Sequence, residues 1–272
     1  MRTPSTAPVV VGVNGSAASL AAVRLGARQA VASDRKLRVV HAFAWPDPRA
    51  AGAQQGYAQA RRDAAKVIDK AIAAAQRYTP GVRVSGALVD GLPARVLLQQ
   101  SRTAALLVLG DDDLALTGQV SPDSVLMQAV ARAFCPTVVA RGPRPPSGPL
   151  LAAVDGSPDS LEALRFAAGE AARRSVPIVV AHVVARSTGE ARGRAVLDQA
   201  VAAVPGLCNA RKRLLVGDPA TTLVTASRKA RMVLAGPRGK DRAALLGPVA
   251  QELLRRGACP TLFVHGTMSP RH

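Results

Sequence analysis

Two short segments in the second half of the chain combine residue types that hold a polar ligand. Residues 155–157 (Asp-Gly-Ser) follow an apolar run and offer a carboxylate and a hydroxyl. Residues 236–239 (Gly-Pro-Arg-Gly) follow another apolar run, and Lys240 and Arg242 come next, so this segment suits an anion. Glycine-rich turns that lead into a helix can present backbone N–H groups to a phosphate. The chemistry indicated is therefore the binding of an anionic ligand.

Residue types that break bonds do not stand together in the sequence. We find no nucleophile beside a candidate base, no paired carboxylates on a shared loop and no Gly-Lys-Ser of a P-loop. The three cysteines have no metal-ligand spacing, and no pair of the four histidines has the spacing that chelates a metal from one helix. Cys135 and Cys259 open two equivalent strands and are interpreted as small buried hydrophobic residues. We therefore expect neither an enzyme nor a metal site.

The formal net charge of +18 raises the question of a nucleic-acid partner. Lys and Arg are scattered through every predicted helix instead of forming one basic arm, and aromatic residues make up only 3% of the chain. Unpaired bases would find few aromatic rings to stack on. We therefore expect no specific nucleic-acid partner, and only weak nonspecific binding at low salt.

The sequence contains two copies of one unit. Residues 9–16 (VVVGVNGS) return as residues 150–157 (LLAAVDGS), so that Asn14 and Asp155 stand 141 positions apart. His41 and His182, each at the end of a second apolar run, have the same separation, whereas Gly91 and Gly217, just after the third strands, are 126 apart. The second copy is therefore 15 residues shorter between its second and third strands. A period of this length indicates a duplicated domain and not a solenoid repeat.

Strands and helices are predicted to alternate along each copy. The unbroken apolar run at residues 9–13 is typical of a parallel strand covered on both faces. Leu20, Val23, Ala27 and Ala30 then recur at the spacing of one helix face. The first copy is expected to continue with strands at 37–42, 82–88, 104–109 and 137–140, and with helices at 54–78, from Pro93 to about 102 and at 123–134. Each copy is thus predicted to be a three-layer α/β/α domain with a five-stranded, parallel, half-Rossmann-like sheet.

A stiff linker separates the two copies. Residues 141–149 (RGPRPPSGP) contain four prolines and two glycines, which predicts domains at residues 1–142 and 149–272. No apolar run approaches the roughly 20 residues that a bilayer requires, so we expect no membrane partner. The first residues lack the pattern of a secretory signal. We therefore expect a cytoplasmic protein.

An ordered set of motifs resembles the universal stress protein family in a tandem two-domain form. The set comprises the VDGS turn, the histidine-ended second strand, the Gly-x-Pro turn, the glycine segment after the fourth strand and the Cys-Pro that opens the last strand. The resemblance covers nearly the whole chain. It implies a non-catalytic stress-response protein with a site for ATP or a related adenine nucleotide, which Mg²⁺ can accompany. It also implies an intramolecular pseudo-dimer, in which residues 137–140 pair with residues 261–264, and further homo-oligomerisation is left open.

The resemblance also assigns site residues by position. In the second copy the implied nucleotide-binding residues are Val154, Asp155, Gly156, Ser157, Val183, Gly236, Arg238, Gly239, Gly247 and Val249. The first copy matches more weakly, at Val13, Asn14, Ala42, Gly110, Ser124 and Val125. An acidic residue after the first strand would hold the ribose hydroxyls, and the end of the second strand would line the adenine.

Both copies depart from the family pattern. In the first copy Asn14 replaces the ribose carboxylate, Asp113 and Asp123 replace two glycines, and the acidic run 111–113 would repel a triphosphate. In the second copy only seven residues separate Gly239 from Gly247, and Pro248 removes both a hydroxyl and a backbone donor. We expect a degenerate nucleotide site, and expect it in the second copy.

Each marked residue also has a purely structural interpretation. Gly110 and Gly236 could be turn glycines that need a positive φ. Asp155 could cap the following helix, and Ser124 could do the same in the first copy. At the level of function, the alternatives to a nucleotide-binding regulator are a nucleotide-free scaffold for protein contacts and, least supported, a nucleotide-activating enzyme.

Overall fold

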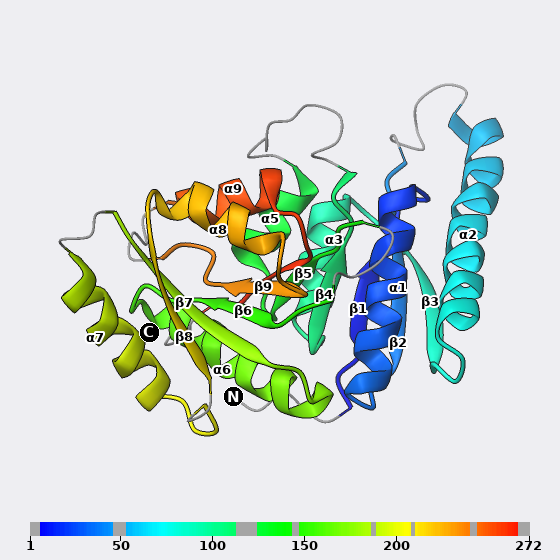
Figure 1. The fold of residues 1–272 in the computed structure, drawn as a ribbon. Helices are drawn as coiled ribbons and strands as arrows, with labels where there is room; N and C mark the ends of the chain where they lie inside the picture. Colours follow the sequence, from blue (N-terminus) through cyan, green and yellow to red (C-terminus); the bar gives the residue numbers. More distant parts are fainter. Residues whose placement is uncertain are drawn as a thin grey trace, which may run out of the picture. The chain divides into compact units, whose positions relative to one another are not determined.

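Alternating strands and helices build both copies, as the apolar periodicity predicts. The computed structural model describes residues 6–45, 53–112, 124–142, 147–185, 189–207, 210–239 and 244–265. These divide into two compact units, the first containing β1 to β5 and the second containing β6 to β10 (Figure 1). The exact boundaries at residues 142 and 149 stay predictions, and so does the pairing of the two last strands.

Among its described residues, the first unit alternates between strand and helix. Its elements are β1 (Val9–Gly12), α1 (Ala17–Ala32), β2 (Leu37–Phe43), α2 (Ala53–Tyr78), β3 (Val84–Asp90), α3 (Pro93–Ser101), β4 (Leu106–Leu109), α5 (Val125–Arg132) and β5 (Thr137–Val139). Hydrogen bonds join its strands in the order β3-β2-β1-β4-β5, and every pair is parallel.

The second unit repeats this arrangement. Its elements are β6 (Leu150–Ala153), α6 (Pro158–Arg174), β7 (Ile178–Val184), α7 (Glu190–Ala202), β8 (Arg211–Val216), α8 (Pro219–Ser227), β9 (Met232–Ala235), α9 (Pro248–Arg256) and β10 (Thr261–Phe263). The strand order is β8-β7-β6-β9-β10, again with every pair parallel. Helices α8 and α9 pack together on one face, and α6 and α7 cover the other (Figure 1). The predicted three-layer α/β fold is confirmed.

The central strands are buried on both faces. Val9, Val10 and Val11 of β1 are at most 1% exposed, and Leu107 and Val108 of the neighbouring β4 are fully buried. A strand with a solvated face would need polar residues at alternate positions. The unbroken apolar run that predicted a parallel sheet therefore reflects cover by helices from both sides.

Some predicted element boundaries are shifted in the structure. Strand β3 begins two residues later than expected, because Val82 N–H donates to Thr79 O at 3.2 Å and so belongs to the preceding turn. Strand β2 continues beyond His41 to Phe43, where it pairs with Asp90 at the end of β3. The histidine therefore lies inside the strand and does not close it.

Cys135 and Cys259, which occupy equivalent positions in the two units, are buried in the two cores. Cys135 is 6% exposed and Cys259 is fully buried, which confirms the interpretation of these two as small hydrophobic residues. Cys208 lies outside the described residues. Burial raises the pKa of Cys135 and the pKa of Cys259 to about 12 each, because desolvation disfavours the thiolate.

The high thiol pKa predicts chemical inertness. At pH 8 iodoacetamide should alkylate Cys135 and Cys259 about a thousand times more slowly in the native protein than in urea, because only the thiolate reacts. Peptide mapping by mass spectrometry measures each site separately. Rapid alkylation of either cysteine in the native chain would mean that its strand opens readily.

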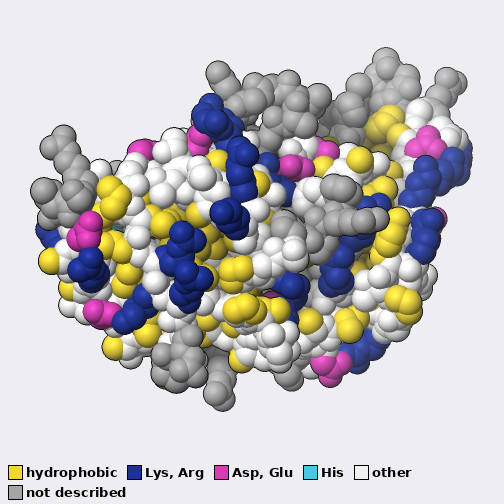
Figure 2. Space-filling view, in the orientation of Figure 1, with side chains coloured by type: hydrophobic (Ala, Val, Ile, Leu, Met, Phe, Trp, Pro, Cys, Tyr) yellow, Lys and Arg dark blue, Asp and Glu magenta, His cyan; other side chains and the backbone are white. Residues whose placement is uncertain are grey.

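Basic side chains do not gather in a single patch on the face drawn in Figure 2, where Lys and Arg are spread over several elements. Many of them pair with a carboxylate of the same helix, as Arg165 does with Glu162 on α6 and Arg255 with Glu252 on α9. Such exposed pairs contribute little to stability.

In the described parts of the chain, no helix is both long and apolar enough to cross a membrane.

Candidate functional site

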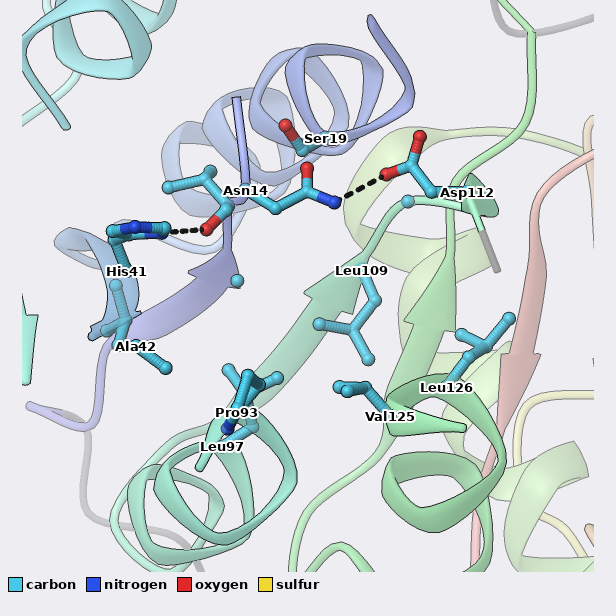
Figure 3. A pocket seen from close by; sticks show the side chains of 14 residues that line it. Asn14, Ser19, His41, Ala42, Pro93, Leu97, Leu109, Asp112, Val125 and Leu126 are labelled. Carbon is cyan, nitrogen blue, oxygen red and sulfur yellow. Dashed lines mark hydrogen bonds between the residues drawn. The ribbon is translucent and has the colours of Figure 1, made fainter. Parts of the chain in front are cut away.

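A cavity lies at the carboxyl ends of the strands in each unit, where the strand order reverses. The strands that follow β1 and β4 pair on opposite sides of this point, as do those that follow β6 and β9, and a crevice for ligands forms at such a switch point. The cavity of the second unit has a volume of about 300 Å³. The cavity of the first unit has a volume of about 170 Å³ (Figure 3).

Most of the predicted site residues line these cavities. In the second unit the predicted residues on the cavity wall are Val154, Asp155, Ser157, Val183, Gly236, Arg238, Gly239, Gly247 and Val249. In the first unit they are Val13, Asn14, Ala42, Gly110 and Val125. Gly156 and Ser124 are not on the wall. Gly156 turns the chain with a φ of +83°, and Ser124 caps α5 by accepting a hydrogen bond from Met127 N–H at 3.0 Å.

The loop after β6 holds Asp155 in a fixed orientation. Asp155 Oδ1 accepts a hydrogen bond from Ser157 N–H at 2.9 Å, which turns the chain into α6. The cap of α6 is Ser157, whose Oγ accepts from Ser160 N–H at 3.2 Å, and Pro158 occupies the first helical turn as predicted. Asp155 is therefore not the helix cap. Its carboxylate lines the cavity beside the helix start.

Gly236 is required by a close approach and not by a positive φ. Neither Gly236 nor Gly110 is among the described residues with φ above zero, so their interpretation as positive-φ turn glycines is wrong. A Cβ at Gly236 would lie 2.6 Å from Asp159 Cβ and 3.0 Å from Asp159 C, in the first turn of α6. A Cβ at Gly110 would lie 2.6 Å from Ala18 C of α1. Because these two residues are glycines, the chain that leaves β9 can pass directly over the start of α6, and the chain that leaves β4 can pass over the start of α1.

The segment after β9 brings Gly239 against Asp155. Gly239 has a φ of +66°, and a Cβ there would lie 2.9 Å from Asp155 Oδ2, so both conformation and space call for glycine. Gly247 N–H donates to Pro237 O at 2.9 Å and joins the two ends of the segment. Lys240 and Arg242 lie outside the described residues, as do Asp113 and Asp123 of the first copy.

Arg238 supplies positive charge to the wall of the second cavity. Its Nε is buried and has no hydrogen-bond partner among the described residues. A buried guanidinium N–H without a protein acceptor is costly unless a ligand or water accepts from it. The site therefore combines the Asp155 carboxylate, in the loop after β6, with the Arg238 guanidinium, in the segment after β9.

Sequence reasoning missed the two histidines as wall residues. His182 Nδ1 lies 2.7 Å from Val154 O, and His41 Nδ1 lies 2.7 Å from Val13 O. A carbonyl oxygen can only accept a hydrogen bond, so Nδ1 carries the proton in both rings. Each ring is thereby held in place by the backbone at the end of its unit's first strand. Both rings line their cavities. The sequence offered one signal for this role: His41 and His182 are 141 positions apart, the same separation as Asn14 and Asp155.

The start of the helix after the third strand was also not assigned to the site. It supplies Pro219 and Leu223 of α8 in the second unit, and Pro93 and Leu97 of α3 in the first. These residues close the apolar side of each cavity. The Gly-x-Pro turns pointed to this location, but the sequence alone does not show which helix face is inward. Within the described ranges, no group of three or more His, Cys, Asp or Glu residues could hold a metal ion.

The first cavity differs from the second at its polar end. Asp112 Oδ2 accepts a hydrogen bond from Ser16 Oγ at 2.5 Å and another from Asn14 Nδ2 at 3.3 Å. Figure 3 shows the Asn14 and Asp112 side chains meeting across the exits of β1 and β4. By position Asn14 corresponds to Asp155 and Asp112 to Arg238. The first copy therefore carries a negative charge where the second carries a positive one.

Comparison with known proteins gives one consistent family. The profile of the Universal stress protein family matches residues 6–141 and residues 147–265. A universal stress protein of Mycobacterium tuberculosis is 31% identical over 93% of this chain and 95% of its own length. One of Mycolicibacterium smegmatis is 28% identical over 94% of this chain and 96% of its own. The crystal structure of a universal stress protein from Archaeoglobus fulgidus matches 96% of this chain and 97% of its own, with a TM-score of 0.74 at 14% identity.

Proposed function

Because the chain belongs to the universal stress protein family, we propose that it is a non-catalytic regulatory protein of the stress response whose second unit binds an adenine nucleotide, ATP in the first instance. The observation that carries the proposal is the second cavity. It combines an apolar wall, the Asp155 carboxylate and the Arg238 guanidinium within about 300 Å³ at the switch point of a parallel sheet. A cytoplasmic location is part of the same proposal.

The chemistry of the wall suggests how the nucleotide lies. Val183 and Leu223 offer an apolar surface to a planar base. Asp155 is oriented by the Ser157 N–H and can accept hydrogen bonds from ribose hydroxyls. The phosphates would extend towards Arg238 and Gly239, where the guanidinium can donate charge-assisted hydrogen bonds. Mg²⁺ would enter bound to the phosphate oxygens, as it commonly does with nucleotides.

A nucleotide-free scaffold is the second candidate function. It is favoured by the helix start after the shortened loop. Gly247 caps α9 without a side-chain hydrogen bond, and Pro248 in the first helical turn has no N–H to offer a phosphate. A phosphate cradle built from this helix start would be poorer than one with a Ser or Thr.

Ligand-dependent stability separates the two candidates. With Mg-ATP present at 100 times its dissociation constant, the free energy of unfolding should rise by about 2.7 kcal/mol. Urea denaturation with and without ATP measures this, and substitution of Asp155 by alanine should abolish most of the rise. If ATP, AMP and cyclic AMP all leave the urea midpoint unchanged, the nucleotide proposal fails and the scaffold remains.

A further inference from the structure

The two cavities share the half of the wall that would face a base and a sugar. Each has an apolar residue ahead of the first loop, a histidine locked to that residue's carbonyl by the same 2.7 Å contact, and a proline and a leucine from the helix after the third strand. The residue after the histidine is Ala42 in one unit and Val183 in the other. Both walls can therefore accept the same kind of apolar, ring-shaped group.

The two cavities differ in charge at the other end. The second unit presents Asp155 and Arg238, whereas the first presents Asn14 and Asp112 at the same positions. Asp112 Oδ2 accepts hydrogen bonds from Ser16 Oγ and Asn14 Nδ2, so a carboxylate of the protein already uses the donors of the first loop. A phosphate placed at this end would face a fixed negative charge instead of a guanidinium.

We propose that the first cavity is a second ligand site that takes an unphosphorylated nucleoside, and that Asp112 excludes phosphorylated ligands from it. Asn14 can exchange hydrogen bonds with ribose hydroxyls, and the Asp112 carboxylate can accept from a hydroxyl that has no phosphate attached. The smaller volume, about 170 Å³ against about 300 Å³, suits a ligand without a phosphate chain. The choice of a nucleoside rests on the proposed function, because it carries the second unit's ligand class to a matching wall.

Calorimetry on a chain with the second cavity blocked tests this directly. Val183→Phe fills the second cavity and leaves the first. In this variant adenosine should bind to one site, and AMP should bind at least about tenfold more weakly, because a like charge a few ångströms from Asp112 is repelled. Adding Asp112→Asn, which keeps the shape and one acceptor oxygen, should reduce the preference for adenosine to below about threefold. Asp63→Asn removes the same charge from an exposed position on α2 and should leave the preference unchanged.

Three results would overturn the inference: no adenosine bound in the Val183→Phe chain, equal affinities for adenosine and AMP, or a preference that survives Asp112→Asn. A second measurement avoids the blocking variant, since adenosine added to the wild-type chain saturated with ATP should still fill one further site. The proposed function is tested separately by ATP binding in an Ala42→Phe chain, in which only the second cavity is open. Loss of ATP binding there, with adenosine still bound in the Val183→Phe chain, would overturn the proposed function alone.

Discussion

Gly236→Ala is expected to lower the free energy of unfolding of the second unit by about 3 kcal/mol. The new methyl carbon would lie 2.6 Å from Asp159 Cβ and 3.0 Å from Asp159 C, and the backbone of a helix cannot move aside as a side chain can. The exit of β9 or the start of α6 must shift. Either shift also disturbs Asp155, so ATP binding should fall together with stability. Urea denaturation gives the free energy, and hydrogen exchange in β9 and α6 shows where protection is lost.

Gly169→Ala is the matched control, because it makes the same substitution within α6. The nearest atom to a Cβ at Gly169 is Arg173 Nη1 at 3.2 Å, the far end of a flexible side chain. Alanine is a better helix former than glycine, so this variant should be more stable than wild type by about 0.5–1 kcal/mol. Equal losses from both substitutions would contradict the close approach at Gly236.

Arg238→Ala is expected to weaken ATP binding about a hundredfold while adenosine affinity changes by less than about threefold. Among the described residues on the wall of the second cavity, Arg238 supplies the positive charge. Its buried Nε has no hydrogen-bond partner among the described residues. ATP would lose a charge-assisted hydrogen bond between its phosphate and the guanidinium. Adenosine has no phosphate and does not make this bond, so its affinity should change little. Calorimetry with both ligands separates the two effects.

Arg228→Ala removes the same charge from the end of α8, where the side chain is exposed and lies off the cavity wall. Screening by salt should keep its effect on ATP affinity within about twofold. A hundredfold loss in both variants would mean that net charge attracts ATP and that Arg238 makes no specific contact. No loss in the Arg238→Ala variant would remove the guanidinium from the proposed site.

Local patterns predicted the architecture well, for a physical reason. A strand buried on both faces cannot contain polar residues, so the apolar run at Val9 to Val11 identified a central parallel strand without any knowledge of its neighbours. The Ser157-Pro158 pair likewise predicted a helix start, because capping involves atoms only a few residues apart. Boundaries were less certain where turn hydrogen bonds compete with strand pairing, as at Val82.

By itself, the sequence determined the duplication, the α/β class and the set of loops that meet at one sheet edge, because these follow from periodicity and from matching residues along the chain. Only the tertiary structure decided why Gly236 is glycine, that the locked histidines line the cavities, and that Asp112 hydrogen bonds with Asn14 and Ser16. Those contacts join residues up to 98 positions apart. They depend on distances between segments that the fold brings together, and the positions of residues along the chain do not give those distances.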